Sequence, residues 1–207
     1  MRAKTARIRK NDPEGLRARV LDAAARLFQA RGYHATAVRD IMDATGVSAG
    51  ALHHHFPTKD SLALAVIKER VAPVVREAWI DPVRTAPSVR QAILLVFAGI
   101  IRGIDQRGSV AGCPLNNLAM ELSASEPQFR EALRPIFREW QAALEEGISK
   151  TRGGARLSQA KRAAAATFVV ASYSGAMNLA KATQSASPLR SAANTLSHWL
   201  SEADLDA

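Results

Sequence analysis

The sequence predicts an all-α protein of about nine helices, and three observations lead to this fold class. Alanine, leucine, arginine and glutamate, which favour helices over strands, dominate many windows of the 207-residue chain. Apolar residues recur at spacings of three and four along most of its length, which is the period of an amphipathic helix. No stretch of useful length alternates apolar and polar residues, as a half-buried strand would.

The chain begins with a basic segment. Five of its first ten residues are lysine or arginine and none is acidic, in a chain with a formal net charge of +9. We interpret residues 1–13 as a basic, disordered arm suited to a polyanion such as nucleic acid, although a merely solvated tail would have the same composition. An amphipathic helix is then expected from Leu16 to a stop at Gly32, because glycine suits the left-handed conformation that ends helices.

Two short helices are expected next, within residues 37–59. Gly46 permits a tight turn between them, Val47 fills the space between the helices, and Ser48 caps the second helix. The second helix is too short to contribute much to a core, so its polar outward residues are better explained as a reader of the DNA major groove. The pattern therefore predicts a helix-turn-helix domain over residues 14–60.

A longer helical pattern runs from about residue 59 toward residue 79. Pro73 lies inside it and predicts a kink or a division, because proline lacks the N–H that a helix interior needs. We interpret residues 61–80 as a connecting helix. The proline-containing pairs at 81–82 and 86–87 predict a linker after it.

Residues 81–207 are interpreted as a second helical domain. Gly153-Gly154 is expected to act as a stop within it. Apolar spacing predicts helices over residues 88–107, 115–122, 128–150, 158–184 and 188–202.

The N-terminal part resembles the tetracycline-repressor-like (TetR) family over most of residues 16–70. The residues that carry the resemblance are Ala24-Ala25-Arg26-Leu27-Phe28, Gly32-Tyr33-His34-Ala35-Thr36, Val38-Arg39-Asp40-Ile41 and the run from Gly46 to Lys59. The resemblance implies a three-helix, DNA-binding helix-turn-helix domain at the N-terminus. It also implies a C-terminal helical domain that binds a small effector and forms a homodimer.

By the same resemblance, a small set of positions contacts DNA. Lys59 is expected to meet a phosphate, and Arg39 to reach the backbone or a base edge. The residues expected at the groove or its rims are Ser48, Ala49, Gly50, His53 and His54. Two positions depart from the family: Ala37 replaces a threonine or serine, for which Thr36 is the available substitute, and His53 replaces a tyrosine.

The chain shows no pattern of catalytic or metal-binding residues. Three consecutive histidines at 53–55 point about 100° apart on a helix, so they cannot converge on one ion. Residues beyond 80 contain no phosphate loop, paired metal spacing or nucleophile arrangement. We therefore expect no catalytic residues, no metal and no cofactor, and an enzyme built on the helical core is the disfavoured alternative.

An effector pocket is expected in the second domain, where polar residues interrupt apolar helices. Buried polar groups need partners, and a ligand is one source of them, although such stripes are more often plain core. The predicted pocket residues are Phe97, Ile100, Asn117, Met120, Phe137, Trp140, Phe168, Tyr173 and Met177. This composition suits a mostly apolar ligand with one or two polar groups.

A dimer interface is expected from two helices. Small residues in residues 165–179 allow close approach of helices, and an apolar stripe follows on the last helix, so a two-fold pair would form a four-helix interface. The predicted interface residues are Ser172, Gly175, Ala176, Leu179, Leu196, Trp199 and Leu200. Such a dimer would present two reading helices to sites about one turn of DNA apart or somewhat more.

Cys113 is the only cysteine, which fits a reducing compartment. No secretory signal and no apolar run of membrane-spanning length is apparent, so a cytoplasmic protein without membrane contact is expected. Cys113 lies at a predicted helix start, whose positive end would lower the pKa of its thiol.

The leading hypothesis is a repressor that a small, mostly apolar effector releases from a double-stranded, palindromic operator. One alternative is a DNA-binding regulator triggered by modification of the Cys113 thiol. Another is an architectural DNA binder without an effector.

Overall fold

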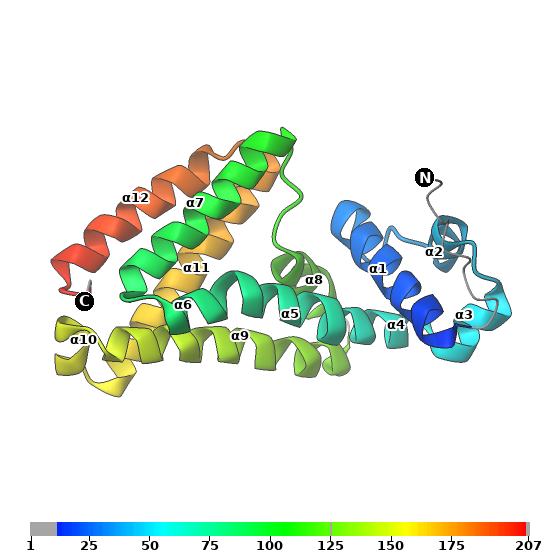
Figure 1. Cartoon of the computed structure of the whole chain (residues 1–207), viewed down its shortest axis with the longest axis horizontal. Helices are drawn as coiled ribbons and strands as arrows, with labels where there is room; N and C mark the ends of the chain where they lie inside the picture. The colour runs from blue at the N-terminus through cyan, green and yellow to red at the C-terminus, as the bar shows by residue number, and fades with distance from the viewer. Residues whose placement is uncertain (1–11, 125, 206–207) are drawn as a thin grey trace, which may run out of the picture.

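The computed structural model describes residues 12–124 and 126–205, and every regular element in these ranges is helical, which confirms the all-α prediction. The basic arm falls almost entirely on residues 1–11 and so lies outside the described part. In Figure 1 the first helices form one end of an elongated molecule and a helical bundle forms the other. The helices are α1 (Pro13–Arg31), α2 (Val38–Thr45), α3 (Ala49–His55), α4 (Lys59–Val66), α5 (Ala72–Val75), α6 (Asp81–Thr85), α7 (Val89–Arg107), α8 (Pro114–Leu122), α9 (Pro127–Ser149), α10 (Arg152–Arg156), α11 (Gln159–Thr183) and α12 (Ser187–Glu202).

Helix α1 begins at Pro13, three residues earlier than the apolar pattern indicated. Asp12 caps it, since its carboxylate accepts a hydrogen bond of 2.9 Å from the backbone N–H of Gly15. Proline suits the first turn because the N–H that it lacks would have no helical partner there. The predicted stop at Gly32 is correct, and this residue has φ of 90°.

Residues 59–85 form one helical run rather than a helix and a linker. Five-residue π-helical segments, Ile67–Val71 and Arg76–Ile80, lie on either side of α5. These wide turns accommodate Pro73, and Arg70 donates a hydrogen bond of 2.9 Å to the Glu69 carbonyl, which an N–H at position 73 would otherwise reach. The linker predicted at 81–82 is wrong, because Pro82 continues this helical run directly after the second π-helical segment.

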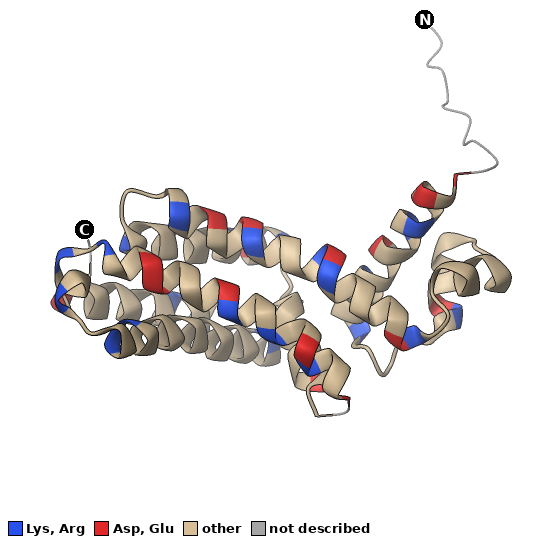
Figure 2. Cartoon of the chain, turned by 90° about the horizontal axis from the view of Figure 1, so that it is seen from below, with Lys and Arg blue, Asp and Glu red and all other residues tan. Residues whose placement is uncertain are grey.

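Helix α9 lies alongside the run from α4 to α6, and α7, α11 and α12 complete the bundle (Figure 1). On the face seen in Figure 2, acidic and basic residues alternate along α9 and this run. Arg76 and Arg84 lie 2.9 and 3.8 Å from the Glu139 carboxylate, so ion pairs join the two. Beneath them, an aromatic cluster fills the core, and Phe97 and Trp140 are fully buried in it.

Gly153 and Gly154 were expected to interrupt helical structure, but they form part of the one-turn helix α10. Thr151 caps this helix by accepting a 3.0 Å hydrogen bond from the Gly154 N–H. A Cβ atom at Gly154 would lie 1.9 Å from the Ile148 carbonyl oxygen, so glycine is needed for packing. With α10 included and the run from α4 to α6 taken as one, the described residues form ten helices rather than about nine.

Helix α11 is, among the described residues, the one helix whose length and apolar composition would suffice to cross a membrane. It packs against α9 and α12, and residues such as Ala166, Val169 and Ala180 are fully buried there. Its apolar character is therefore that of a core helix.

Candidate DNA-binding surface and ligand cavity

Helix α3 is formed by the local signals that the sequence contains. Gly46 has φ of 69°, the left-handed conformation that ends α2. Ser48 then caps α3, since its Oγ accepts a 3.3 Å hydrogen bond from the Ala51 N–H. Val47 and Leu52 are buried, which holds the short helix against the domain. The predicted turn, cap and plug are therefore confirmed.

The residues predicted to face DNA are exposed on and around α3. Ser48, Ala49, Gly50, His53 and His54 are all exposed, as is Arg39 on α2. Four of the predicted residues, Ala49, Gly50, His53 and Lys59, line one shallow groove. A Cβ atom at Gly50 would have nothing within 4 Å, so packing within the chain does not require glycine there. The position is open, so another molecule could approach the backbone closely there.

The hydroxyl that Ala37 lacks is compensated by a residue other than the one expected from the sequence. Thr36 does not replace the missing hydroxyl, because it is fully buried and donates a 2.7 Å hydrogen bond to the Gly32 carbonyl. Asp40 instead accepts a 2.7 Å hydrogen bond from the Ala37 N–H, which is half of a capping box. Helix α2 is thus capped without the hydroxyl.

Lys59 lies at the first position of α4 with its Nζ 4.1 Å from the centre of the Tyr33 ring. Partial burial lowers the pKa of Lys59, and this effect outweighs the opposing influence of acidic neighbours such as Asp60. In the DNA-free protein its ammonium therefore rests on an aromatic face, from which it must turn to reach a phosphate.

Tyr33 joins the helix-turn-helix domain to the bundle. Its hydroxyl donates a hydrogen bond to Asp60 of α4, and its ring packs edge-on against Phe28 of α1 and Phe129 of α9, with centroid distances of 5.4 and 5.9 Å. Burial and Asp60 raise the pKa of Tyr33, so the hydroxyl stays protonated and remains a donor. Tyr33 therefore links α9 to the start of α4 through its ring and its hydroxyl.

Lys59→Ala is expected to weaken binding to all DNA sequences by a similar factor. Losing one phosphate contact should also reduce the slope of log K against log salt by about 0.9. Titrations of two unrelated duplexes at several salt concentrations measure both effects. Lys68→Ala, at an exposed position on the same helical run, is the matched control. A loss confined to one DNA sequence would contradict a phosphate role for Lys59.

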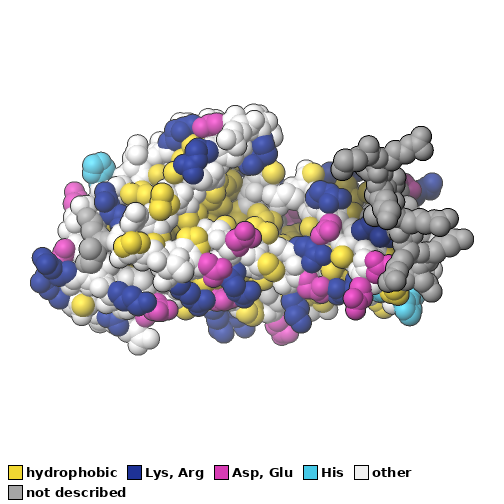
Figure 3. Space-filling view, in the orientation of Figure 1, with side chains coloured by type: hydrophobic (Ala, Val, Ile, Leu, Met, Phe, Trp, Pro, Cys, Tyr) yellow, Lys and Arg dark blue, Asp and Glu magenta, His cyan; other side chains and the backbone are white. Residues whose placement is uncertain are grey.

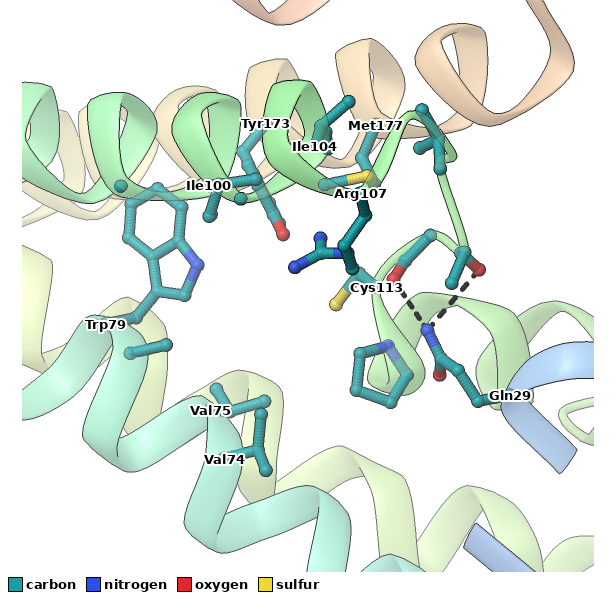
Figure 4. Close-up of a pocket in the computed structure, with 17 residues that line it drawn as sticks. Gln29, Val74, Val75, Trp79, Ile100, Ile104, Arg107, Cys113, Tyr173 and Met177 are labelled. Atoms are coloured by element: carbon teal, nitrogen blue, oxygen red, sulfur yellow. Dashed lines mark hydrogen bonds between the residues drawn. The ribbon is translucent and has the colours of Figure 1, made fainter. Parts of the chain in front are cut away.

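A cavity of about 440 Å³ opens between α1, the run from α4 to α6, α7 and the loop before α8. Figure 3 shows a hollow with hydrophobic side chains in this region, and Figure 4 shows the lining residues. Three predicted pocket residues, Ile100, Tyr173 and Met177, line it. Sequence reasoning missed Gln29 and Arg107, because nothing in a helical stripe indicates which neighbouring helix it will face.

The other predicted pocket residues lie elsewhere. Phe97 and Trp140 are buried in the aromatic cluster behind Tyr173, and Asn117 lines a neighbouring cavity of about 340 Å³. Phe137 does not line the cavity and packs against the core. The predictions for Met120 and Phe168 are wrong, since these side chains are 72% and 45% exposed on the outer faces of their helices.

Cys113 lines the cavity at the start of α8, and the expectation of a lowered thiol pKa is wrong. Burial raises the pKa of Cys113, and this effect exceeds the stabilisation of the thiolate by the backbone of Asn116 and Leu115. Cys113 does lie at the start of α8, but the loss of solvent around its thiol has the larger effect on the pKa.

Residues 110–112 form a wall of the cavity that side chains from α1, from α8 and from the residue after α11 hold in place. Gln29 of α1 donates from Nε2 to the carbonyls of Ala111 and Gly112, at 3.3 and 2.7 Å (Figure 4). Asn117 donates to the Ala111 carbonyl at 3.0 Å. Gln184 accepts a hydrogen bond of 3.0 Å from the Val110 N–H. The DNA-binding domain is therefore tied to the cavity wall.

A second groove, of about 450 Å³, lies between α11 and α12. It is lined by the predicted interface residues Ser172, Gly175, Ala176, Leu179 and Leu196. Trp199 packs on Phe168 nearby, with ring centroids 4.9 Å apart. Leu196, at the floor of the groove, and Leu200 are 1% and 0% exposed, so the prediction that they lie on an exposed interface was wrong.

The comparisons with known proteins agree across both domains. Residues 20–66 match the bacterial regulatory proteins of the tetR family, and residues 90–195, more than half of the chain, match the C-terminal domain of LmrA/YxaF-like transcriptional regulators. The HTH-type transcriptional regulator LmrA of Bacillus subtilis is 29% identical over 174 residues, which cover 84% of this chain and 90% of that protein.

Further relatives have the same character. The HTH-type transcriptional repressor DhaR of a Mycobacterium species is 27% identical over 185 residues, which cover 84% of this chain and 86% of that protein. A TetR transcriptional regulator from Chloroflexus aurantiacus has a crystal structure that is similar with a TM-score of 0.77, at 29% identity over 92% of this chain and 96% of that chain. The chain therefore belongs to the TetR family of helix-turn-helix transcriptional regulators.

Proposed function

We propose that this regulator is a cytoplasmic repressor whose dimer binds a palindromic operator and is released by a small, mostly apolar effector. One observation carries the proposal. The cavity of about 440 Å³ is lined by Gln29 from the DNA-binding domain and by Trp79, Ile100 and Met177 from the rest of the chain. A ligand in it touches both parts at once. The relative DhaR is named a repressor, which supports the same direction of control.

The proposed coupling passes through the wall formed by residues 110–112. Gln29 donates to two carbonyls of this wall, and its Oε1 is buried without a hydrogen-bond partner among the described residues. A ligand that moves the wall, or donates to this oxygen, changes how α1 is held. Only a ligand that binds the two conformations with different affinities can shift their populations.

Two ion pairs join α1 to the helical run after α4. We infer that they make the DNA-binding domain move as one body. Arg17 donates two hydrogen bonds of 2.6 Å to the Glu69 carboxylate, and Arg70 donates one of 2.7 Å to Asp22. Glu69 and Arg70 lie within the first π-helical segment, Ile67–Val71, and Pro73 follows it in α5. We therefore place the hinge between reader and bundle at residues 71–76.

The dimer in this proposal forms through the α11–α12 groove. A Cβ atom at Gly175 would have nothing within 4 Å, and the Leu179 side chain is 59% exposed. The groove therefore offers a second copy of the chain an apolar surface with room at its middle. A two-fold pair of these helices gives the four-helix interface expected from the sequence.

The alternatives have less support. The raised pKa and the burial of Cys113 count against a thiol trigger, because the thiolate is the reactive form. A cavity of this size favours an effector over a purely architectural role. The named relatives are transcriptional regulators, which favours a regulator over an enzyme.

Selection from a random duplex library tests the proposal. The purified protein is expected to enrich an inverted repeat whose half-sites lie about one helical turn, roughly 10 base pairs, or somewhat more apart. Sequencing of the bound fraction over successive rounds measures this. Enrichment of an asymmetric sequence, or of none, would count against a dimeric operator binder.

A further inference from the structure

Arg107, at the end of α7, is the one charged side chain among the described residues that line the cavity. It makes no ion pair with the described part of the chain. The nearest acidic residue in sequence, Asp105, is already bound by Arg190, with distances of 2.6 and 2.8 Å. Arg107 is exposed to solvent where it borders the cavity, and no acidic side chain among the described lining residues neutralises its charge.

The position of this charge is built into α7. Gly103 lies one turn before Arg107, and a Cβ atom there would be 3.0 Å from Nη1 and 3.4 Å from Nη2 of Arg107. The guanidinium therefore lies close against α7 beside Gly103. Figure 4 shows the Arg107 side chain turned into the cavity, above Cys113.

The remainder of the lining is mostly apolar. Trp79, Ile100, Ile104 and Met177 offer it hydrophobic surface, and no aspartate or glutamate is among the described lining residues. A neutral ligand that covered the guanidinium would remove it from water without giving it a partner, which costs free energy. A ligand with an acidic group would instead form a charge-assisted pair, which a planar guanidinium makes in bidentate geometry.

From this arrangement we infer that the effector is an organic anion: an apolar, ring-containing or aliphatic body with a carboxylate or similar acidic group that pairs with Arg107. This inference rests on the proposed function, which gives the cavity its role as an effector site. It adds the sign of the ligand's charge and the residue that recognises it.

Two fluorescent probes with one skeleton test the inference. N-phenyl-1-naphthylamine is neutral, and 8-anilino-1-naphthalenesulfonate is the same molecule with a sulfonate. Titration of the full-length protein is expected to give tighter binding of the sulfonate. Arg107→Gln should weaken binding of the sulfonate about tenfold, as expected for a hydrogen-bonded charge pair, and leave the neutral probe within about twofold.

Two further variants control for where the probes bind. Arg102→Gln removes the same charge from an exposed position on α7 outside the cavity, and should change neither affinity. Gly99→Phe should abolish binding of both probes, because Gly99 lines the cavity and a Cβ atom there has no neighbour closer than 3.9 Å. Thermal melting checks that each variant is folded.

The outcomes separate the inference from the proposed function. If Gly99→Phe removes both probes but Arg107→Gln affects neither, the cavity binds ligands and the inferred anion preference is wrong. If Gly99→Phe is folded and leaves both probes bound, the probes lie elsewhere, and the cavity loses its support as the effector site. A loss of sulfonate binding in Arg102→Gln equal to that in Arg107→Gln would also overturn the inference.

Discussion

Replacing Gly50 with glutamate is expected to lower operator affinity by on the order of a hundredfold, about 3 kcal/mol, without lowering thermal stability. Gly50 is exposed in the first turn of α3, where a Cβ atom would meet nothing within 4 Å. A glutamate at this place would hold the DNA backbone off and bring a negative charge to the phosphates, and like charges brought together at an interface cost several kcal/mol.

Stability should move in the opposite direction. Glycine within a helix is destabilising by roughly 0.5–1 kcal/mol relative to alanine, and an acidic side chain near a helix start is favourable. Fluorescence anisotropy with a labelled operator and thermal melting give the two quantities. Gln91→Glu, which adds the same charge at an exposed position on α7, should leave both nearly unchanged. Wild-type affinity in Gly50→Glu would remove α3 from the DNA interface.

The helix-turn-helix could be predicted from the sequence because its signals are local. Gly46 needs a left-handed conformation, Ser48 caps within three residues, and Val47 fills a space between adjacent helices. Each of these effects depends on neighbours in the chain. The same locality explains why the stop at Gly32 was found.

The cavity could be predicted only in part because its lining depends on how distant helices meet. Spacing shows that Met177 and Met120 lie on helices with apolar stripes, but not which stripe faces a hollow. Met177 is buried beside the cavity, whereas Met120 is 72% exposed. Gln29 and Arg107 carry no apolar signal, and they line the cavity because α1 and the end of α7 both border it.

The incorrect prediction of a linker at residues 81–82 has a different cause. Proline usually ends a helix, but it is tolerated where its missing N–H has no helical partner to lose. The π-helical turns before Asp81 shift the hydrogen bonding by one residue, and Pro82 lies in the first turn after them. That shift in hydrogen bonding depends on the whole helical run, which packs against α9. No single residue in the sequence indicates it.

Leu179→Arg is expected to convert the protein from dimer to monomer and to lower operator affinity by on the order of a hundredfold or more. In a two-fold interface each residue of the groove faces the same surface of the partner, so one substitution brings two positive charges into one apolar contact. Linking two half-site contacts raises affinity by roughly 10² to 10⁴, and a monomer loses that gain.

Leu95→Arg is the matched control for this prediction, because Leu95 is exposed to a similar degree, 57% against 59%, but lies on α7 away from the α11–α12 groove. Light scattering at micromolar concentration should find Leu95→Arg dimeric and Leu179→Arg monomeric, with similar melting temperatures. Because the Leu179 side chain is 59% exposed within one chain, its replacement is expected to leave each protomer folded. A dimeric Leu179→Arg that binds operator normally would therefore place the interface on another face, and the two reading helices would need a different geometry to span the half-sites.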